Sequence, residues 1–194
     1  MTLTEHLRAI SGTEWASANV GLLQSQRFSN PSSLNDEVAT FPIIKAALET
    51  LENVSESGPE EQVIGLQGQV LTLLALVDVA KKRDERDPKV DAEYTLLDYL
   101  HLVTPEQFME AALLSGMGSD ALDPDKAIKE VIDEFPIIKH FYNVMQRLDR
   151  EIREARASGK TPEEGAPLVK DFERAAGALA ALAVLVKVAE AQQG

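Results

Sequence analysis

Apolar residues recur along this chain with the three- and four-residue spacing that is typical of helices. Ile138, Phe141, Met145, Leu148 and Ile152 follow one another at such intervals, which places them on one helical face. Alternating runs of β-branched residues and Asn-Gly or Asp-Gly turns, the usual signals of strands and hairpins, are nearly absent. The pattern therefore predicts an all-α protein.

The hydrophobic pattern also repeats over about half the chain. The segment Phe-Pro-Ile-Ile-Lys at 41–45 recurs letter for letter at 135–139, 94 positions later. The apolar positions that follow stay in register, and 76–80 resembles 185–189 after about 15 extra residues in the second copy. We predict a helical bundle built by tandem duplication of a four- to five-helix unit. Residues 1–90 and 91–194 would be the two repeats, related by a pseudo-twofold axis and sharing one core.

Two helix starts agree with this duplication. Ser11 and Glu14 have the spacing of a capping box, in which each side chain bonds the other residue's backbone amide. Thr104 and Gln107 rebuild the same device in the second copy, with Pro105 at the first helical position. Apolar residues flank both boxes where a hydrophobic staple would place them.

Each predicted repeat starts with two helices, and a proline bends a short third helix into a long fourth one. The expected ranges are 4–10, 13–24, 34–40 and a final helix around 70–80 in the first copy, and 93–103, 105–114, 125–134 and 168–191 in the second. Loops are expected at 25–33 and 115–123, with a charged surface linker at 81–89. The final helix is apolar on every side between Ala178 and Val186, so it should be buried. Small residues at Gly65 and Gly68 favour a close approach of two helices.

Composition narrows the classes of function. The chain has 32 acidic and 19 basic residues and a net charge of −13, which disfavours nucleic acid and anionic membranes as partners. The absence of cysteine excludes disulfides and thiolate chemistry. No signal peptide is evident at the N-terminus, and the most apolar stretch, 175–186, is short for a membrane span. We expect a cytoplasmic protein that does not bind membranes.

Candidate catalytic chemistry is sparse. Asp98 and His101 form one Asp-x-x-His pattern, whereas carboxylate-bridged metal bundles need Glu-x-x-His on two helices and further glutamates. The pattern has no equivalent in the first repeat, so these two residues are only weak candidates for metal ligands. We predict no catalytic residue, no cofactor and no metal.

The repeats differ most in the charge of their long helices. Glu49 and Glu52 give an acidic stripe in the first copy, and Arg147, Arg150 and Arg153 occupy the corresponding region of the second, longer helix. Our hypothesis is that this extended helix is an arm that contacts a protein partner or a second copy of the chain. The alternative is a solvated face whose charges pair within the helix, as Arg147 with Glu151 and Arg150 with Glu154.

These observations favour a non-catalytic protein–protein interaction or assembly protein, such as an adaptor, an inhibitor or immunity-like partner, or a structural subunit. One alternative is a helical bundle that binds a hydrophobic small molecule between its apolar final helices. A second alternative is a metal-dependent enzyme using Asp98 and His101.

Overall fold

The computed structural model describes residues 1–24, 40–87, 93–114 and 132–192. Every regular element in these ranges is a helix, which confirms the predicted all-α class. The helices are α1 (Leu3–Arg8), α2 (Gly12–Gln24), α4 (Pro42–Ser55), α5 (Glu60–Arg86), α6 (Leu96–Leu102), α7 (Pro105–Leu114), α9 (Pro136–Ala157) and α10 (Pro162–Ala191). The predicted loops at 25–33 and 115–123, and nearly all of the predicted short third helices, lie outside the described residues.

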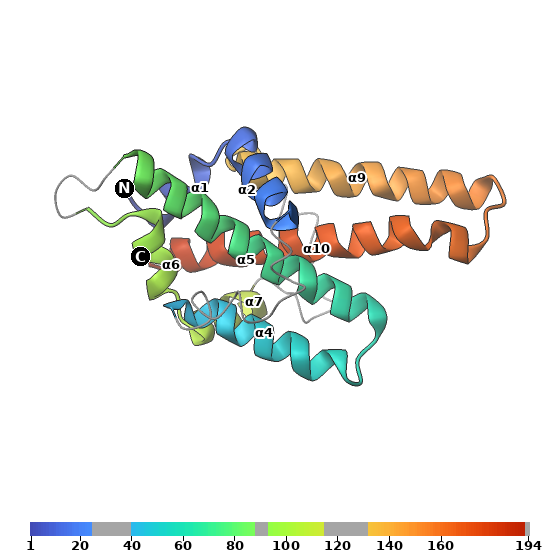
Figure 1. Cartoon of the computed structure of the whole chain (residues 1–194), viewed down its shortest axis with the longest axis horizontal. Coiled ribbons are helices and arrows are strands. Elements are labelled where there is room, and N and C mark those ends of the chain that lie inside the picture. Colours follow the sequence, from blue (N-terminus) through green and yellow to red (C-terminus); the bar gives the residue numbers. More distant parts are fainter. Residues whose placement is uncertain (25–39, 88–92, 115–131, 193–194) are drawn as a thin grey trace.

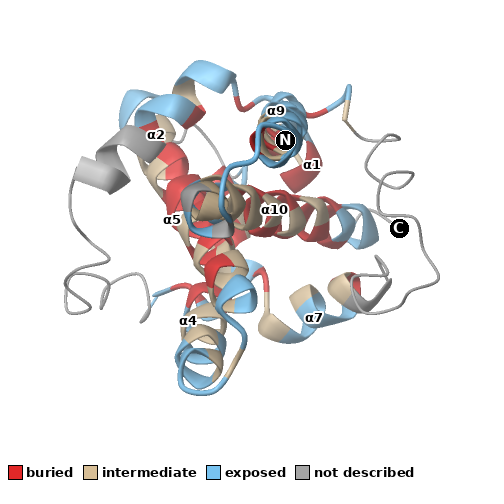
Figure 2. Cartoon of the chain, turned by 90° about the vertical axis from the view of Figure 1, so that its right-hand side faces the viewer, coloured by how far each residue is buried: buried red, intermediate tan, exposed pale blue. Residues whose placement is uncertain are grey.

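The two longest helices, α5 and α10, cross at the centre of the molecule and the other helices surround them (Figure 1). Helix α4 packs on α5 and α9 packs on α10, so that α4 and α9 lie on opposite sides of the central pair (Figure 2). Helix α2 contacts α5 and α9, and α7 contacts α10 and α4. The short helix α1 contacts α6 and α10, and α6 also contacts α5.

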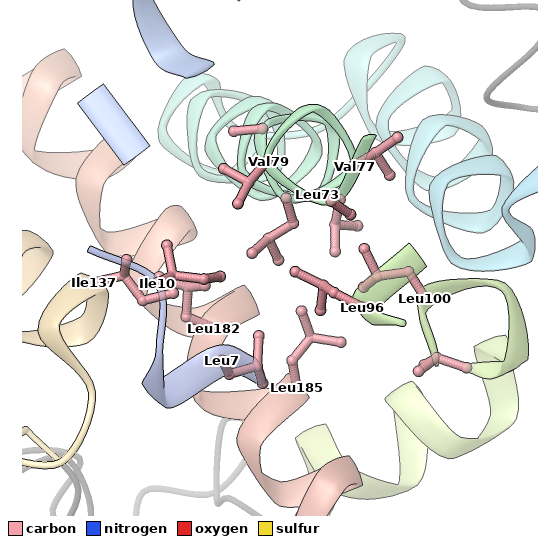
Figure 3. Close-up of a cluster of buried hydrophobic side chains, with 14 of the residues drawn as sticks. Leu7, Ile10, Leu73, Val77, Val79, Leu96, Leu100, Ile137, Leu182 and Leu185 are labelled. Atoms are coloured by element: carbon pink, nitrogen blue, oxygen red, sulfur yellow. The ribbon is translucent and has the colours of Figure 1, made fainter. Parts of the chain in front are cut away.

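Buried apolar side chains from both halves of the chain form one cluster around this crossing (Figure 3). Leu73 and Val77 of α5, Leu182 and Leu185 of α10, and Leu7 of α1 all belong to this cluster. In α10 the stretch from 178 to 186 is buried except at Ala180 and Ala183, which are half-buried. The prediction that this segment is buried on nearly every side is confirmed.

Helix α5 is the one described helix that is long and apolar enough to cross a membrane by length and composition. Most of its apolar stretch is buried inside the protein, as it is in the central helix of a bundle. The feature is therefore weak evidence for a membrane location.

Capping boxes start the four short N-terminal helices of the two halves. The two predicted boxes are present: the Glu14 amide donates to Ser11 Oγ at 3.2 Å, and the Gln107 amide donates to Thr104 Oγ1 at 3.2 Å. Two further boxes, at Thr2 and Thr95, start α1 and α6. Thr2 and Thr95 are each followed three positions later by an acidic residue, Glu5 and Asp98, but the helix starts predicted at 4 and 93 do not coincide with these boxes.

Several predicted boundaries need correction. Helix α5 begins at Glu60 rather than near 70, and α10 begins at Pro162 rather than at 168. Pro42 and Pro136 do not lie within helical stretches; each is the first residue of a helix and follows an extended phenylalanine that serves as the N-cap. The predicted linker at 81–89 is wrong over its first six residues, because α5 continues to Arg86. Helix α6 begins at Leu96 rather than at 93, since Thr95 is its cap.

Glycines allow the central helices to touch backbone to backbone. A Cβ atom added at Gly68 would lie within 3 Å of the carbonyl group of Arg174, and one added at Gly177 would overlap the carbonyl group of Gly65 in the same way. The prediction that small residues near Gly68 permit a close helix approach is confirmed.

Candidate functional site

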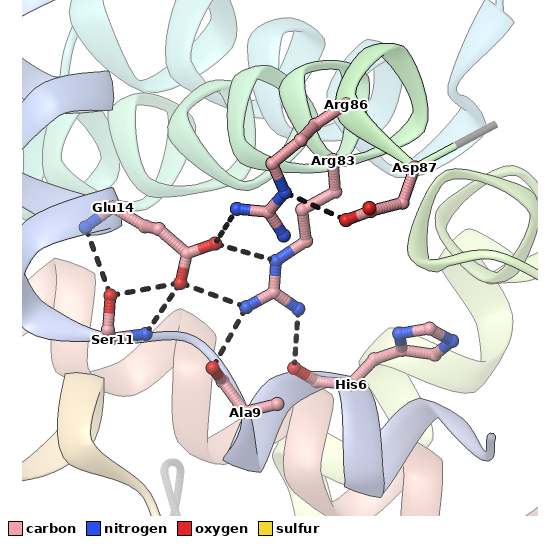
Figure 4. A network of polar contacts seen from close by, with 7 residues as sticks. All are labelled: His6, Ala9, Ser11, Glu14, Arg83, Arg86 and Asp87. Carbon is pink, nitrogen blue, oxygen red and sulfur yellow. Dashed lines mark hydrogen bonds and ion pairs between the residues drawn. The ribbon is translucent and has the colours of Figure 1, made fainter.

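The most elaborate polar cluster joins α1, α2 and α5, and Arg83 is its centre (Figure 4). Arg83 extends from the last turn of α5, where its Nε donates to Glu14 Oε1 at 2.9 Å and its Nη2 donates to Glu14 Oε2 at 3.0 Å. Nη2 also donates to the carbonyl oxygen of Ala9, the C-cap of α1, at 2.8 Å. The side chains of Arg83 and Glu14 are 17% and 26% exposed, so the pair is partly shielded from water. We call Arg83, Glu14, Ser11 and Ala9 the Arg83 clamp.

Glu14 is held in its ionised form by this clamp. The bidentate contact with Arg83, together with hydrogen bonds from the Ser11 amide (3.0 Å) and hydroxyl (2.9 Å), lowers the pKa of Glu14 to about 2. A general base works best when its pKa lies near the working pH. Glu14 is therefore suited to joining helices and poorly suited to proton transfer.

The neighbouring Ser11 and His6 do not form a nucleophile–base pair. The Ser11 hydroxyl donates to Glu14, whereas the His6 ring points away from Ser11 (Figure 4) and its Nε2 lies 3.1 Å from the carbonyl oxygen of Tyr94. Burial lowers the pKa of His6, so the ring is mainly neutral at pH 7. Nucleophilic catalysis requires the base within hydrogen-bond reach of the hydroxyl, and this arrangement does not provide it.

An open cavity of about 790 Å³ lies beside the clamp. Most charges in its described wall are paired: Arg83 with Glu14, Arg86 with Asp87 at 2.7 Å, and the amino group of Met1 with Glu93 at 3.4 Å. Asp84 also lines the cavity; it accepts a hydrogen bond from the Thr95 hydroxyl at 3.2 Å and has no ion pair with a described residue. Because the clamp itself is used to join α1, α2 and α5, we assign the cluster a structural role.

The three arginines singled out from the sequence share one exposed face of α9. Arg147, Arg150 and Arg153 line an open groove of about 400 Å³ together with Asn143, Gln146 and the acidic Asp149. Arg147 pairs with Glu151 at 3.7 Å, as predicted, and Arg153 pairs with Asp149 at 2.8 Å. The predicted pair of Arg150 with Glu154 is not formed, and within the described ranges Arg150 makes no ion pair.

The acidic candidates lie on a different face of the molecule. Glu49 and Glu52 are exposed on α4, which the α5–α10 pair separates from α9 (Figure 2). Glu49 lies 3.9 Å from Lys45, which is a weak i, i+4 contact. The structure thus brings the arginines together with one another but not with the two glutamates.

Asp98 and His101, the weak metal candidates, have separate structural partners. Asp98 accepts a hydrogen bond from the Thr95 amide at 2.9 Å and completes the capping box of α6. His101 Nδ1 lies 3.0 Å from the carbonyl oxygen of Thr40, and its ring stacks on Phe41 at 4.2 Å between centroids. Among the described residues, no group of three His, Asp or Glu side chains could hold a metal ion.

Sequence reasoning missed Arg83 as the centre of a clamp. The sequence predicts a surface linker for the basic run that contains it, and no sequence signal connects it with Glu14, 69 positions earlier.

Comparisons with known proteins found no relative of this chain. No family model, curated protein or solved structure matches the chain.

Proposed function

We propose that this chain is a non-catalytic protein–protein interaction or assembly protein whose binding surface is the exposed arginine face of α9. One observation carries the proposal: Arg147, Arg150 and Arg153 share one exposed face of α9, where Arg147 and Arg153 make only exposed ion pairs within the helix and Arg150 makes none with a described residue. By contrast, the Ser11, His6 and Asp98 side chains are used in caps and contacts between helices. Arginine suits this role because its planar guanidinium binds carboxylates with two parallel hydrogen bonds.

We further propose that the fold consists of two repeats related by a pseudo-twofold axis. Helices α1, α2, α4 and α5 would correspond to α6, α7, α9 and α10. Exchanging the two sets converts the contact of α1 with α10 into that of α6 with α5, and the contact of α2 with α9 into that of α7 with α4. The packing of α4 on α5 becomes that of α9 on α10. This agreement supports the duplication that the sequence repeat predicts.

Individual side chains support the same relationship. Arg8 of α1 pairs with Glu134 at 2.7 Å and lies over the ring of Phe135 at 5.4 Å. The position equivalent to Arg8 is His101, which contacts the carbonyl oxygen of Thr40 and stacks on Phe41. Different residue types therefore contact equivalent residues at the start of α9 and of α4, although Arg8 binds a side-chain carboxylate and His101 a backbone carbonyl oxygen.

The first residues of the two repeats also contact each other in a symmetric way. His6 Nε2 lies 3.1 Å from the carbonyl oxygen of Tyr94, and Tyr99 donates its hydroxyl to the carbonyl oxygen of Met1 at 3.0 Å. His6 corresponds to Tyr99 and Met1 to Tyr94 at a shift of 93 positions. The rings of His6 and Tyr99 contact each other at 5.8 Å between centroids, as expected for equivalent residues beside the axis.

The crossing of α5 and α10 also consists of two equivalent contacts. A shift of 109 positions takes Gly68 to Gly177 and Gly65 to Arg174. The contact of Gly68 with Arg174 then becomes that of Gly177 with Gly65, and both are close backbone contacts. Such reciprocal contacts are characteristic of an interface with twofold symmetry.

Departures from this symmetry indicate where a specific function resides. Helix α9 has 22 residues and α4 has 14, so the second hairpin is longer by about 12 Å. Asn143, Gln146 and Arg150 occupy the positions of Glu49, Glu52 and Glu56, which replaces three carboxylates by two neutral amides and one guanidinium group. The scaffold is thus conserved between the halves while the exposed face of α9 is distinct.

The proposal is tested by capturing partners on the immobilised full chain. We expect R150E/R153E to lose protein partners that the wild type retains, because the reversed charges repel an acidic surface. The control K82E/K187E changes the net charge equally at two exposed lysines outside α9 and should retain them. Equal capture by both variants would reject the α9 face, and a wild type that retains only a small molecule would favour a ligand-binding bundle.

A further inference from the structure

We infer that the basic face of α9 binds the acidic face of α4 on a second copy of the chain, so that copies associate head to tail. The inference rests on the proposed function and names the partner. The basic face consists of Arg147, Arg150 and Arg153; the acidic face consists of Glu49, Glu52 and Glu56.

The basic face is an exception in an acidic molecule. The chain carries a net charge of −13, yet α9 contains five basic and three acidic residues. Arg147 and Arg153 have exposed ion pairs within the helix, and such pairs hold their partners weakly. Arg150 lies between them without an ion pair to any described residue. All three guanidinium groups are therefore accessible to carboxylates of another molecule.

The acidic face has matching dimensions. Glu49 and Glu52 are exposed in the second half of α4 and Glu56 is exposed as its C-cap residue, and Glu52 and Glu56 make no ion pair with any described residue. Seven residues separate Glu49 from Glu56, which is about 10 Å along a helix; Arg147 and Arg153 are about 9 Å apart by the same measure. Two helices laid side by side can thus place the three carboxylates opposite the three guanidinium groups.

The positions of the two faces determine the type of assembly. Helices α4 and α9 lie on opposite sides of the α5–α10 pair, so one chain cannot pair its own two faces (Figures 1 and 2). A contact between different faces of identical chains is heterologous, and it forms open chains or rings. Each copy can then bind two neighbours at once.

The association should be weak and dependent on concentration. Exposed ion pairs contribute little individually, and the net negative charge of each copy opposes association at long range. The attraction between the two faces acts only where they touch, whereas the repulsion between the net charges of the two copies acts over the whole approach. We therefore expect reversal of two charges on either face to weaken association at least tenfold, because it places like charges opposite each other.

Sedimentation velocity of the full chain over a range of concentrations tests this inference. The wild type should form species with masses that are whole multiples of one chain. E49K/E52K and R150E/R153E should each remain monomeric, whereas their equimolar mixture should associate, since the reversed faces are complementary. K82E/K187E and E106K/E110K are matched controls with the same charge changes at exposed positions elsewhere, and they should behave as the wild type does.

Recovery of assembly in the mixture also shows that both variants are folded. A wild type that stays monomeric at every concentration, or an assembly that survives either reversal, would overturn the inference. So would an equimolar mixture of variants that does not associate. If a monomeric wild type still captures another protein through Arg150 and Arg153, the proposed function stands and only the self-association is rejected.

Discussion

The backbone contact between α5 and α10 yields the sharpest stability prediction. Replacing a helical glycine by alanine normally stabilises a helix by about 1 kcal/mol. At Gly68 the new Cβ would overlap the carbonyl group of Arg174, and at Gly177 that of Gly65. A backbone carbonyl cannot rotate away as a side chain can, so the helices must separate. Overpacking of this kind costs about 1–3 kcal/mol, and separation also loosens the core around Leu73.

We expect Gly68→Ala and Gly177→Ala each to lower the free energy of unfolding by about 2 kcal/mol. This value takes an overpacking cost near the upper end of its range, about 3 kcal/mol, and subtracts the gain in helix propensity of about 1 kcal/mol. Gly165→Ala is the matched control, because nothing lies within 4 Å of a Cβ at that position of α10. It should leave stability unchanged or raise it by up to about 1 kcal/mol. Urea unfolding followed by far-ultraviolet circular dichroism measures all three. If either crossing variant is stabilised as much as Gly165→Ala, the close crossing is wrong.

Three further predictions concern buried or clamped side chains. Because the pKa of Glu14 is lowered to about 2, its contribution to stability is complete above its ordinary value of 4.5 and is lost as the pH falls toward 2. Glu14→Gln should lower the free energy of unfolding by about 1–2 kcal/mol at neutral pH, allowing for solvent screening. The variant should also lose less stability than the wild type as the pH falls from 4.5 toward 2. An unchanged dependence of stability on pH would contradict the clamp. Burial and nearby positive charge lower the pKa of His6, so stability should fall as the pH drops below about 6.5, and His6→Gln should reduce that loss when unfolding is measured at pH 7.5 and 5.5. Trp15 is 1% exposed and its Nε1 has no hydrogen-bond partner in the described structure, so Trp15→Phe should be nearly neutral, because relief of the unpaired N–H offsets about 1 kcal/mol of lost burial. A loss above about 2 kcal/mol in thermal or urea unfolding would mean that the indole N–H is satisfied.

Much of the helical architecture could be predicted because its determinants are local. The box formed by Ser11 and Glu14 depends on residues three positions apart, and it is found as expected. The burial of α10 between Ala178 and Val186 follows from a segment that is apolar on all sides. The role of Pro42 was predicted less well, because its ring is compatible with both a bend within a helix and the first turn of a new one. The extended backbone of Phe41 distinguishes the two.

The polar contacts between helices could not be predicted because they depend on the packing. Arg83 and Glu14 meet only after α5 has been placed beside α2, and a basic run near a helix end has an adequate local explanation. Similarly, the sequence predicted arginines on one face of α9 but could not show that Arg150 lacks an ion pair in the described structure while its neighbours have one. Helix periodicity places residues on a face, whereas partners depend on rotamers and on neighbouring elements.

The proposed interaction function is tested most directly by native mass spectrometry of the protein purified gently from its own source. We predict masses above that of the 21.2 kDa chain, either as whole multiples of it or with an added protein. A bare monomer in every preparation, or a chain carrying only a stoichiometric metal or small molecule, would contradict the proposal of an interaction or assembly protein.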